Sequence, residues 1–354
     1  MLSGFGQLSA AFFGEILSRK HRQAVRVRSV EVADYLDRAD LKKVDLESTL
    51  GPVQMIVKVL PQARRREALV WRFLAQAGTL PVPDLYHVEF DQRLGSYGVV
   101  LEFVAPLAET ASWPPAQCGR VGRALASLHA PFWSKAGELP EPFGAPATAP
   151  EATVEPAARR FVDRMSGRRQ AMLYAALPEA FTFLAKLLRM TPSFFAEAAD
   201  LPATLIHGAL DRSEVLFRPG GSPEPVLIDW QQARSGRGTE DVASLTNSLP
   251  AAARPAGSAE LLAAYAEGIR SAGIDVSPER LAEEVARQRV LLGAKGLVAG
   301  CGQYAERSGQ AEHRQWCASF VGEATGDVAE WKALLDALAR KADHAHPPEP
   351  REIV

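Results

Sequence analysis

Hydrophobic and polar positions in the N-terminal part of the chain follow the period of strands, with one interruption. Valines recur with an imperfect period of two over residues 25–32, and residues 41–60 have the pattern of two strands joined at the Gly51-Pro52 turn pair. Over residues 63–77 the apolar positions instead share one stripe of a helix. Strand character then returns up to residue 104. This part of the chain therefore predicts strands broken by one helix.

The remainder of the chain is dominated by helical periodicity. The pattern predicts helices in residues 116–133, across 158–200, and from about 258 to 340. Two other segments separate them: residues 140–157 are rich in Pro and Ala and predict a loop or linker, and residues 204–230 predict short strands and loops. Most of the polar candidates for chemistry fall in or just after that last segment.

These patterns predict an α+β fold with two lobes. We expect a strand-rich N-lobe over residues 1–104, beginning with an amphipathic helix, and a mostly helical C-lobe over residues 105–340. Within the C-lobe, residues 204–245 contain most of the polar candidates for chemistry, and we expect a catalytic loop and a metal site there on the motifs and the resemblance given below. The tail, residues 341–354, has the composition of a disordered segment.

Composition narrows the class of protein without identifying a function. The chain has 354 residues, of which 47% are hydrophobic, and its formal net charge is −2. This balance gives no reason to expect nucleic acid or an anionic membrane as a partner. Glu15 interrupts the apolar N-terminus, and the basic residues follow that stretch instead of preceding it, unlike in a secretory signal. With three scattered cysteines, the sequence predicts a cytoplasmic protein with reduced thiols.

Lys58 lies in the apolar segment "MIVKVL". Alternation places it on the same strand face as Ile56 and Leu60. A lysine in such a strand must find an anion or reach solvent, because an unpaired buried charge is costly. Glu67, nine residues later in the predicted helix, is one candidate partner. The alternative is an edge-strand lysine whose ammonium group reaches water.

Two carboxylates flank the predicted strands 215–217 and 226–228. If these strands pair as a hairpin, Glu214 and Asp229 lie at the same open end of it. Two carboxylates at a strand end are a candidate site for Mg²⁺, a hard cation that prefers oxygen ligands. The alternative is a pair of solvated turn residues.

Several segments together resemble a known family. The segments "IVKVL", "RREALVWRFLA", "LIHGALDRSEVLF" and "VLIDWQQARSGRGTEDVASL" follow one another in the order found in the aminoglycoside and choline kinase-like phosphotransferases, within a match of about residues 25–300. The segment "LHAPFW" is similar to the ecdysteroid kinase-like branch. The resemblance implies the two-lobed protein-kinase-like fold, with ATP between the lobes and a hydroxylated small molecule as acceptor.

The resemblance also implies roles for individual residues. Lys58 would contact the phosphates of ATP, and Glu67 would anchor that lysine. Asp229 would bind Mg²⁺. His207 begins the catalytic loop, which Asp241 would brace by hydrogen bonds to the backbone.

The sequence departs from the family pattern at the positions that matter most for chemistry. Ala209 stands where the family has the aspartate that accepts the proton of the acceptor hydroxyl, and a methyl group cannot do so. Glu214 replaces an asparagine that serves as the second metal ligand, and Asp211 replaces a histidine. The segment "ADYLDRADL", between the first two strands, has no glycine, although a phosphate cradle needs close backbone approach. Its three aspartates would repel a triphosphate.

Three hypotheses follow from these departures. The first is a divergent ATP-dependent kinase of a small molecule, with Asp211 acting as the base and Glu214 as a metal ligand; losing the usual base need not abolish phosphoryl transfer, which depends mainly on positioning and electrostatics. The second is a pseudokinase that binds a nucleotide, a metabolite or a partner protein. The third is an enzyme that uses the same cleft for another reaction.

Overall fold

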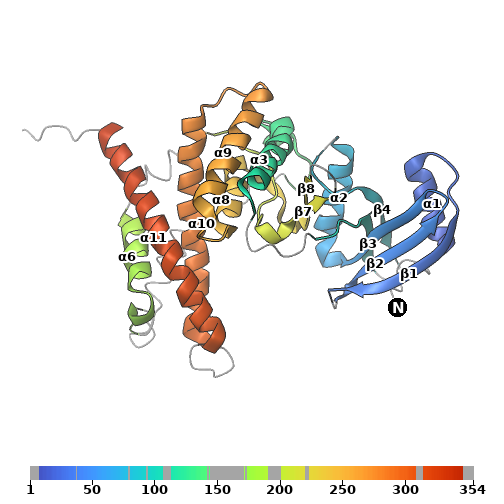
Figure 1. Ribbon diagram of the computed structural model, residues 1–354, viewed down its shortest axis with the longest axis horizontal. Coiled ribbons are helices and arrows are strands. Elements are labelled where there is room, and N and C mark those ends of the chain that lie inside the picture. Colours follow the sequence, from blue (N-terminus) through green and yellow to red (C-terminus); the bar gives the residue numbers. More distant parts are fainter. Residues whose placement is uncertain are drawn as a thin grey trace, which may run out of the picture. The chain divides into compact units, whose positions relative to one another are not determined.

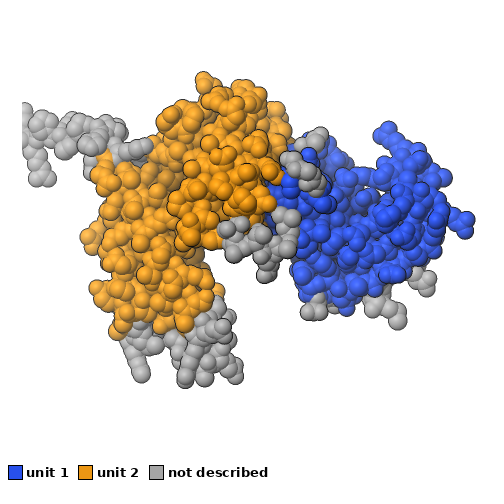
Figure 2. Space-filling model, viewed as in Figure 1, with its two compact units in different colours: residues 1–110, 140–143, 213–233 blue, residues 111–139, 144–212, 234–354 orange. Residues whose placement is uncertain are grey.

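The computed structural model describes residues 8–36, 38–78, 80–92, 95–106, 113–141, 143, 171, 174–189, 201–219, 223–307 and 314–345. The chain forms two compact units (Figure 2). The first comprises residues 1–110, 140–143 and 213–233, and the second comprises the rest. The first unit thus includes the 213–233 segment, which lies beyond the predicted N-lobe boundary at residue 104. The lobe boundaries themselves remain a prediction.

A five-stranded antiparallel sheet forms the body of the first unit. Its strands are β1 (Val27–Tyr35), β2 (Arg38–Ser48), β3 (Gly51–Pro61), β4 (Leu85–Asp91) and β5 (Ser96–Glu102), in the spatial order β1-β2-β3-β5-β4 (Figure 1). A short 3-10 turn, η1 (Gln62–Arg64), leads from β3 into helix α2 (Arg65–Gln76). The structure therefore confirms the predicted strands and the predicted helix between them. The predicted turn lies two residues earlier than expected, at Thr49 and Leu50, because Gly51 and Pro52 already belong to β3 and pair with Ser48 and Glu47.

Helix α1 (Ala10–His21) confirms the predicted amphipathic N-terminal helix. The side chain of Ser9 caps it by accepting a hydrogen bond from the Phe12 amide at 3.3 Å. One face buries Phe13 and Leu17 in a hydrophobic cluster with the sheet, which includes Val44 of β2. Because this face is fully covered, α1 belongs to the core of the first unit.

A second, smaller hairpin also belongs to the first unit. It consists of β7 (Val215–Arg218) and β8 (Glu224–Leu227), followed by the 3-10 turn η6 (Trp230–Gln232). Arg218 donates to Glu102, at the end of β5, at 2.7 and 2.9 Å. This ion pair and a backbone hydrogen bond from Leu227 to Pro81 of 2.7 Å attach the hairpin to the rest of the unit.

The second unit is mostly helical. Its described elements are α3 (Pro115–His129), α6 (Pro178–Arg189), α8 (Gly238–Ser248), α9 (Arg254–Ser271), α10 (Pro278–Arg307), α11 (Arg314–Ala345), and a two-stranded sheet of β6 (Thr204–Ile206) and β9 (Arg234–Gly236). Helices α3 and α9 pack so closely at Gly122 that a side chain at this position would collide with the backbone carbonyl of Leu261. The predicted helical character of this part is confirmed where it is described.

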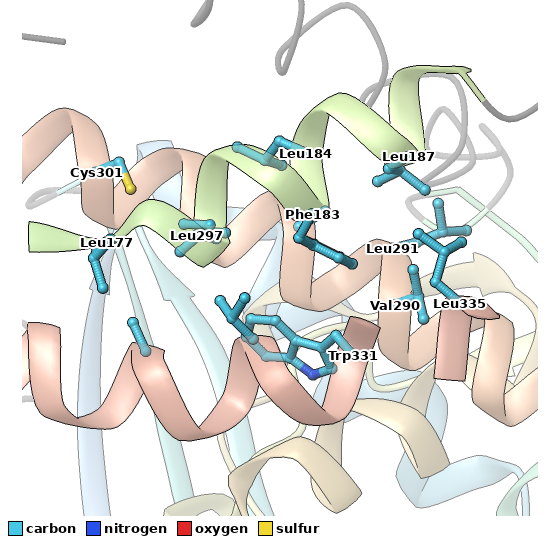
Figure 3. Packing of buried hydrophobic residues seen from close by; sticks show 14 of the residues in the cluster. Leu177, Phe183, Leu184, Leu187, Val290, Leu291, Leu297, Cys301, Trp331 and Leu335 are labelled. Atoms are coloured by element: carbon cyan, nitrogen blue, oxygen red, sulfur yellow. The ribbon is translucent and has the colours of Figure 1, made fainter. Parts of the chain in front are cut away.

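Helices α6, α10 and α11 share one hydrophobic core (Figure 3). Phe183 from α6, Leu291 from α10 and Leu335 from α11 are each fully buried in it. Helix α11 continues to Ala345, so it extends into the tail that the sequence predicts to be disordered. Most of the predicted linker 140–157, most of 158–200 and the rest of the tail lie outside the described residues. In the described part of the chain, no helix combines the length and apolarity needed to cross a membrane.

Candidate functional site

Lys58 lies on the central strand of the sheet and forms an ion pair with Glu67. It is opposite Leu41 of β2 on one side and Val99 of β5 on the other, so the edge-strand alternative does not hold. Its ammonium group contacts Glu67 Oε1, and the glutamate is only 1% exposed. The structure thus contains the predicted pair. Which ligand it binds remains a prediction.

The Lys58–Glu67 pair is part of a closed ring of polar contacts within the first unit. The other four contacts are Arg64 Nη2 to Glu67 Oε2 at 2.6 Å, Arg64 Nη2 to Gln231 Oε1 at 3.3 Å, Gln231 Nε2 to Asp229 Oδ2 at 3.4 Å, and Lys58 Nζ to Asp229 Oδ1 at 3.4 Å. We call these five residues the polar ring. Two cations, two carboxylates and one amide make it electrically neutral.

Asp229 owes its position to an unusual backbone conformation. Its φ of 59° and ψ of 57° lie in the left-handed region, which aspartate tolerates better than most residues. The next residue, Trp230, is fully buried, and its indole N–H donates to the carbonyl of Leu227 at 2.9 Å. The chain therefore turns sharply at the end of β8, with Asp229 at the turn.

Glu214 lies near Asp229 along the hairpin but one residue out of the expected register. The predicted hairpin forms, with Val215 opposite Leu227. The carbonyl of Glu214 accepts a hydrogen bond from the amide of Ile228 at 2.9 Å, so Ile228, and not Asp229, is opposite Glu214. The expected side-by-side position of Glu214 and Asp229 is wrong by this one step, because β7 and β8 pair with Val215 opposite Leu227 and not opposite Ile228.

The donor set around Asp229 fits a magnesium ion carried by a nucleotide. Among the described residues, no group of three or more His, Cys, Asp and Glu is arranged to hold a metal. Mg²⁺ in phosphate-binding sites needs only one or two protein carboxylates, because phosphates and water complete its shell. Asp229, whose side chain is 31% exposed, offers one such carboxylate. The metal role of Asp229 and Glu214 remains a prediction.

The segment expected between the first two strands is mostly strand, since Asp34 lies in β1 and Asp40 in β2. Both of these aspartates are paired with cations. Asp34 contacts Lys42, and Asp40 contacts Arg38 at 2.7 Å and Arg64 at 3.8 Å. The hydrogen bond from Arg38 lowers the pKa of the Asp40 carboxyl, so this acid stays ionised and paired. The predicted repulsion of a triphosphate is therefore reduced at these two positions. Asp37 lies outside the described residues.

In the second unit, Asp241 holds the start of the loop that follows β6. Its carboxylate accepts hydrogen bonds from the amides of His207 at 2.7 Å and Gly208 at 2.9 Å. His129 Nε2 lies 3.2 Å from the same carboxylate, and its Nδ1 lies 3.0 Å from the hydroxyl of Tyr265. This arrangement matches the expected brace. Gly208 has a φ of 85°, which only glycine adopts at little cost.

The electrostatics of Asp241 favour its charged form. Burial by itself would raise the pKa of this carboxyl, which is 1% exposed. The hydrogen bond and charge of His129, the charge of His207 and the Gly208 amide outweigh burial and lower the pKa. The brace is thus a buried anion with several donors around it.

The other end of this loop is held by a residue that sequence reasoning missed. Ser248 Oγ, in the last turn of α8, accepts a hydrogen bond from the amide of Arg212 at 3.0 Å. Between the two ends, Leu210 is fully buried, whereas Ala209 and Asp211 on either side of it are exposed. Ala209 and Asp211 are therefore both open to solvent, and the role of Asp211 remains a prediction.

Arg64 and Gln231 of the polar ring were missed as well. Arg64 lies in the basic run "RRRE", and Gln231 lies in the "LIDWQ" motif. Neither spacing nor alternation relates the two residues, which are 167 positions apart in the chain. Only the position of Gln231 in the "LIDWQ" motif, next to Asp229, could have indicated that it belongs to the site.

Comparison of the sequence with models of known protein families identifies a match to one family. Residues 47–274 match the profile described as the phosphotransferase enzyme family. A search of curated proteins found no match to the sequence.

Solved structures of similar fold include a putative aminoglycoside phosphotransferase from Ralstonia eutropha, with a TM-score of 0.59, 16% identity, and coverage of 91% of this chain and 98% of that one. A spectinomycin phosphotransferase in complex with ADP and spectinomycin has a TM-score of 0.50, 11% identity, and coverage of 94% and 99%. Amicoumacin kinase in complex with AMP-PNP and Ca²⁺ has a TM-score of 0.50, 14% identity, and coverage of 88% and 93%. These likenesses confirm the predicted kinase-like α+β fold.

Proposed function

Because the chain belongs to the phosphotransferase enzyme family, we propose that it binds Mg·ATP and phosphorylates a hydroxylated small molecule at a low rate. The observation that carries the proposal is the position of Lys58, held between Glu67 and Asp229. A strand lysine fixed by a helix carboxylate, next to an acid suited to a metal, is the arrangement that binds nucleotide phosphates in kinases. We assign the chain to the ecdysteroid kinase-like branch on its sequence segments alone.

The residues of the first unit have distinct roles in this proposal. Lys58 binds phosphate oxygens, and Glu67 positions its ammonium group. Asp229 and Glu214 hold magnesium, which, when bound, neutralises charge on the phosphates. The ADP of the spectinomycin phosphotransferase and the AMP-PNP and Ca²⁺ of amicoumacin kinase support a nucleotide and a divalent cation as ligands.

The loop of the second unit supplies the acceptor chemistry. We assign Asp211 as the general base that takes the hydroxyl proton while the acceptor oxygen bonds to the γ-phosphorus of ATP and ADP leaves. We assign His207 as a positioning residue at the start of this loop, where Asp241 holds its backbone amide. A base usually contributes about 10²–10⁴ to the rate, so a substitute two residues from the usual position is expected to leave turnover low. The small-molecule ligand of the spectinomycin phosphotransferase supports a small acceptor. The cytoplasmic location expected from the sequence remains part of the proposal.

Thermal stabilisation tests the binding step directly. We expect the unfolding midpoint to rise with Mg·ATP and to rise less with ATP in EDTA or with AMP. EDTA removes the magnesium ion that Asp229 and Glu214 would bind, and AMP lacks the two outer phosphates that Lys58 would bind. Equal shifts in all three conditions would remove the assigned metal role of Asp229 and Glu214.

A pseudokinase is the second candidate, and the exposed methyl group of Ala209 at the base position favours it. Such a protein would bind Mg·ATP without turning it over in the presence of any hydroxylated acceptor. Turnover of the wild type with hydroxylated acceptors separates the two candidates, because only the kinase transfers phosphate without a change in sequence. Ala209→Asp then shows whether the site is still organised for transfer, because only such a site would gain turnover. Analysis of the reaction products by phosphorus NMR would also detect a different reaction in the same site.

A further inference from the structure

The guanidinium group of Arg64 lies near three acceptor residues of the first unit. Arg64 is the last residue of η1, and its guanidinium group lies 2.6 Å from Glu67, 3.3 Å from Gln231 and 3.8 Å from Asp40. Its side chain remains 30% exposed, whereas Glu67 is 1% exposed. A cation with one side on a buried carboxylate and another side open to solvent is placed to receive an anion.

The buried carboxylate of Glu67 connects this cation to Lys58. Lys58 contacts Oε1 and Arg64 contacts Oε2, so one negative charge is shared by two positive charges. The second negative charge that balances the polar ring comes from Asp229. If Asp229 binds a metal ion instead, the three charged residues that remain, Lys58, Arg64 and Glu67, carry one excess positive charge. A partly desolvated excess charge is costly unless another anion replaces the lost one.

The phosphate chain of a nucleotide is the anion that fits this position. The connection between β1 and β2 has no glycine, so it cannot bring backbone amides as close to a phosphate as a glycine-rich loop does. A guanidinium group offers several donors in one plane and binds phosphate oxygens in pairs. The exposed part of Arg64 therefore supplies donors that the backbone of this chain does not.

We propose that Arg64 is a second phosphate-binding cation, beside Lys58. Its guanidinium group donates to phosphate oxygens in place of the backbone amides of a glycine-rich loop. This inference rests on the proposed function, since it assumes that the first unit binds Mg·ATP. In the structure described here, Arg64 donates to Gln231, which in turn donates to Asp229. Binding of the metal-nucleotide opens the polar ring at Gln231 and transfers Arg64 to the phosphates.

A purely structural role for Arg64 is the competing explanation. The neighbouring Arg66 shows such a role, because it donates to the carbonyl of Ala233 at 2.5 Å and thereby ties α2 to the segment after Asp229. A structural clamp would affect every nucleoside ligand to the same extent. A phosphate-binding cation would instead matter more as the ligand carries more phosphate groups.

Calorimetric titration of the full chain with Mg·ATP, Mg·ADP, AMP and adenosine distinguishes these roles. We expect Arg64→Ala to weaken Mg·ATP about tenfold or more, to weaken AMP less, and to leave adenosine within about twofold. Arg64→Lys should recover part of the loss, because it restores the charge without the paired donors. Arg65→Ala is the charge-matched control, since Arg65 is exposed and contacts only Glu141, at 3.6 Å, among the ion pairs of the described residues.

The outcomes separate the inference from the proposed function. If Arg64→Ala weakens adenosine as much as Mg·ATP, or leaves Mg·ATP unchanged, Arg64 is a structural residue and the inference is wrong while the proposed function stands. If the wild-type chain does not bind Mg·ATP, the proposed function fails, and the inference fails with it. The unfolding midpoint of each variant, measured without ligand, verifies that the chain still folds.

Discussion

Asp241 and Ser248 lie about two turns apart on α8 and hold the two ends of one loop. Asp241 accepts hydrogen bonds from the amides of His207 and Gly208, and Ser248 accepts one from the amide of Arg212. A single helix therefore fixes the segment that contains Ala209 and Asp211. A loop held at both ends by one helix does not depend on the side chains of Ala209 or Asp211 for its conformation.

Replacement of Asp241 by asparagine should destabilise the second unit strongly. Asparagine keeps one acceptor oxygen, but its amide group opposes one of the two backbone donors, which leaves a buried polar group unpaired. We expect a loss of about 3 kcal/mol in the free energy of unfolding at neutral pH, measured by denaturant titration. Asp275→Asn, at an exposed aspartate of the same unit, is the matched control and should change stability little.

The pH dependence of stability should carry the signature of Asp241. Its folded-state pKa is lowered, so its contribution to stability is complete above the pKa of the unfolded chain, about 4, and is lost as the pH falls through the folded value. The unfolding midpoint of the wild type should therefore fall more steeply below about pH 4 than that of Asp241→Asn. Parallel curves for the two proteins would show that this carboxylate does not contribute in the expected way.

Removal of the Ser248 hydroxyl should loosen one end of the loop without unfolding the unit. Ser248→Ala leaves the amide of Arg212 without its side-chain acceptor, so stability should fall by about 1 kcal/mol and amide exchange at Arg212 should accelerate. Ser258→Ala, whose hydroxyl is exposed and donates within α9, should leave that amide unchanged. Slow exchange at Arg212 in Ser248→Ala would mean that the loop has another support.

Asp211 and Ala209 can be tested as a pair. If Asp211 is the base, Asp211→Asn should lower turnover about tenfold or more, and Ala209→Asp should raise it by a similar factor. Both residues are exposed, so neither change is expected to disturb folding. Steady-state ADP release with a panel of hydroxylated acceptors measures the effect, and unchanged turnover in Asp211→Asn would exclude this residue as the base.

Lys58→Met should weaken Mg·ATP binding about tenfold or more, because the substitution removes the charge and keeps the apolar stem. Glu67 remains paired with Arg64 in this variant, so the chain should still fold. Lys42→Met, on the neighbouring strand, removes an equal charge that is paired with Asp34 and serves as the control. Similar losses in both variants would indicate a general effect of charge and not a specific contact.

The parts of the structure that were predictable from the sequence depend on local periodicity. Alternation in β3 and the helical stripe of α2 placed Lys58 and Glu67 on adjoining elements, and their pairing follows from that proximity. The contact between Arg64 and Gln231 joins residues 167 positions apart, so no local pattern contains it. The register of the β7–β8 hairpin was also missed by one residue, because the pattern of apolar residues does not show which residues of the two strands lie opposite each other. The hydroxyl of Ser248 gave no signal, since serine is common near helix ends.

The most direct test of the central claim is the magnesium dependence of ATP binding, measured by calorimetry on the wild type and Asp229→Asn. If Lys58, Arg64 and Asp229 form a metal-nucleotide site, the wild type should bind ATP about tenfold more tightly with Mg²⁺ than with EDTA, and Asp229→Asn should lose most of that difference. Equal affinity with and without Mg²⁺ in the wild type, or no binding of ATP at all, would contradict the account.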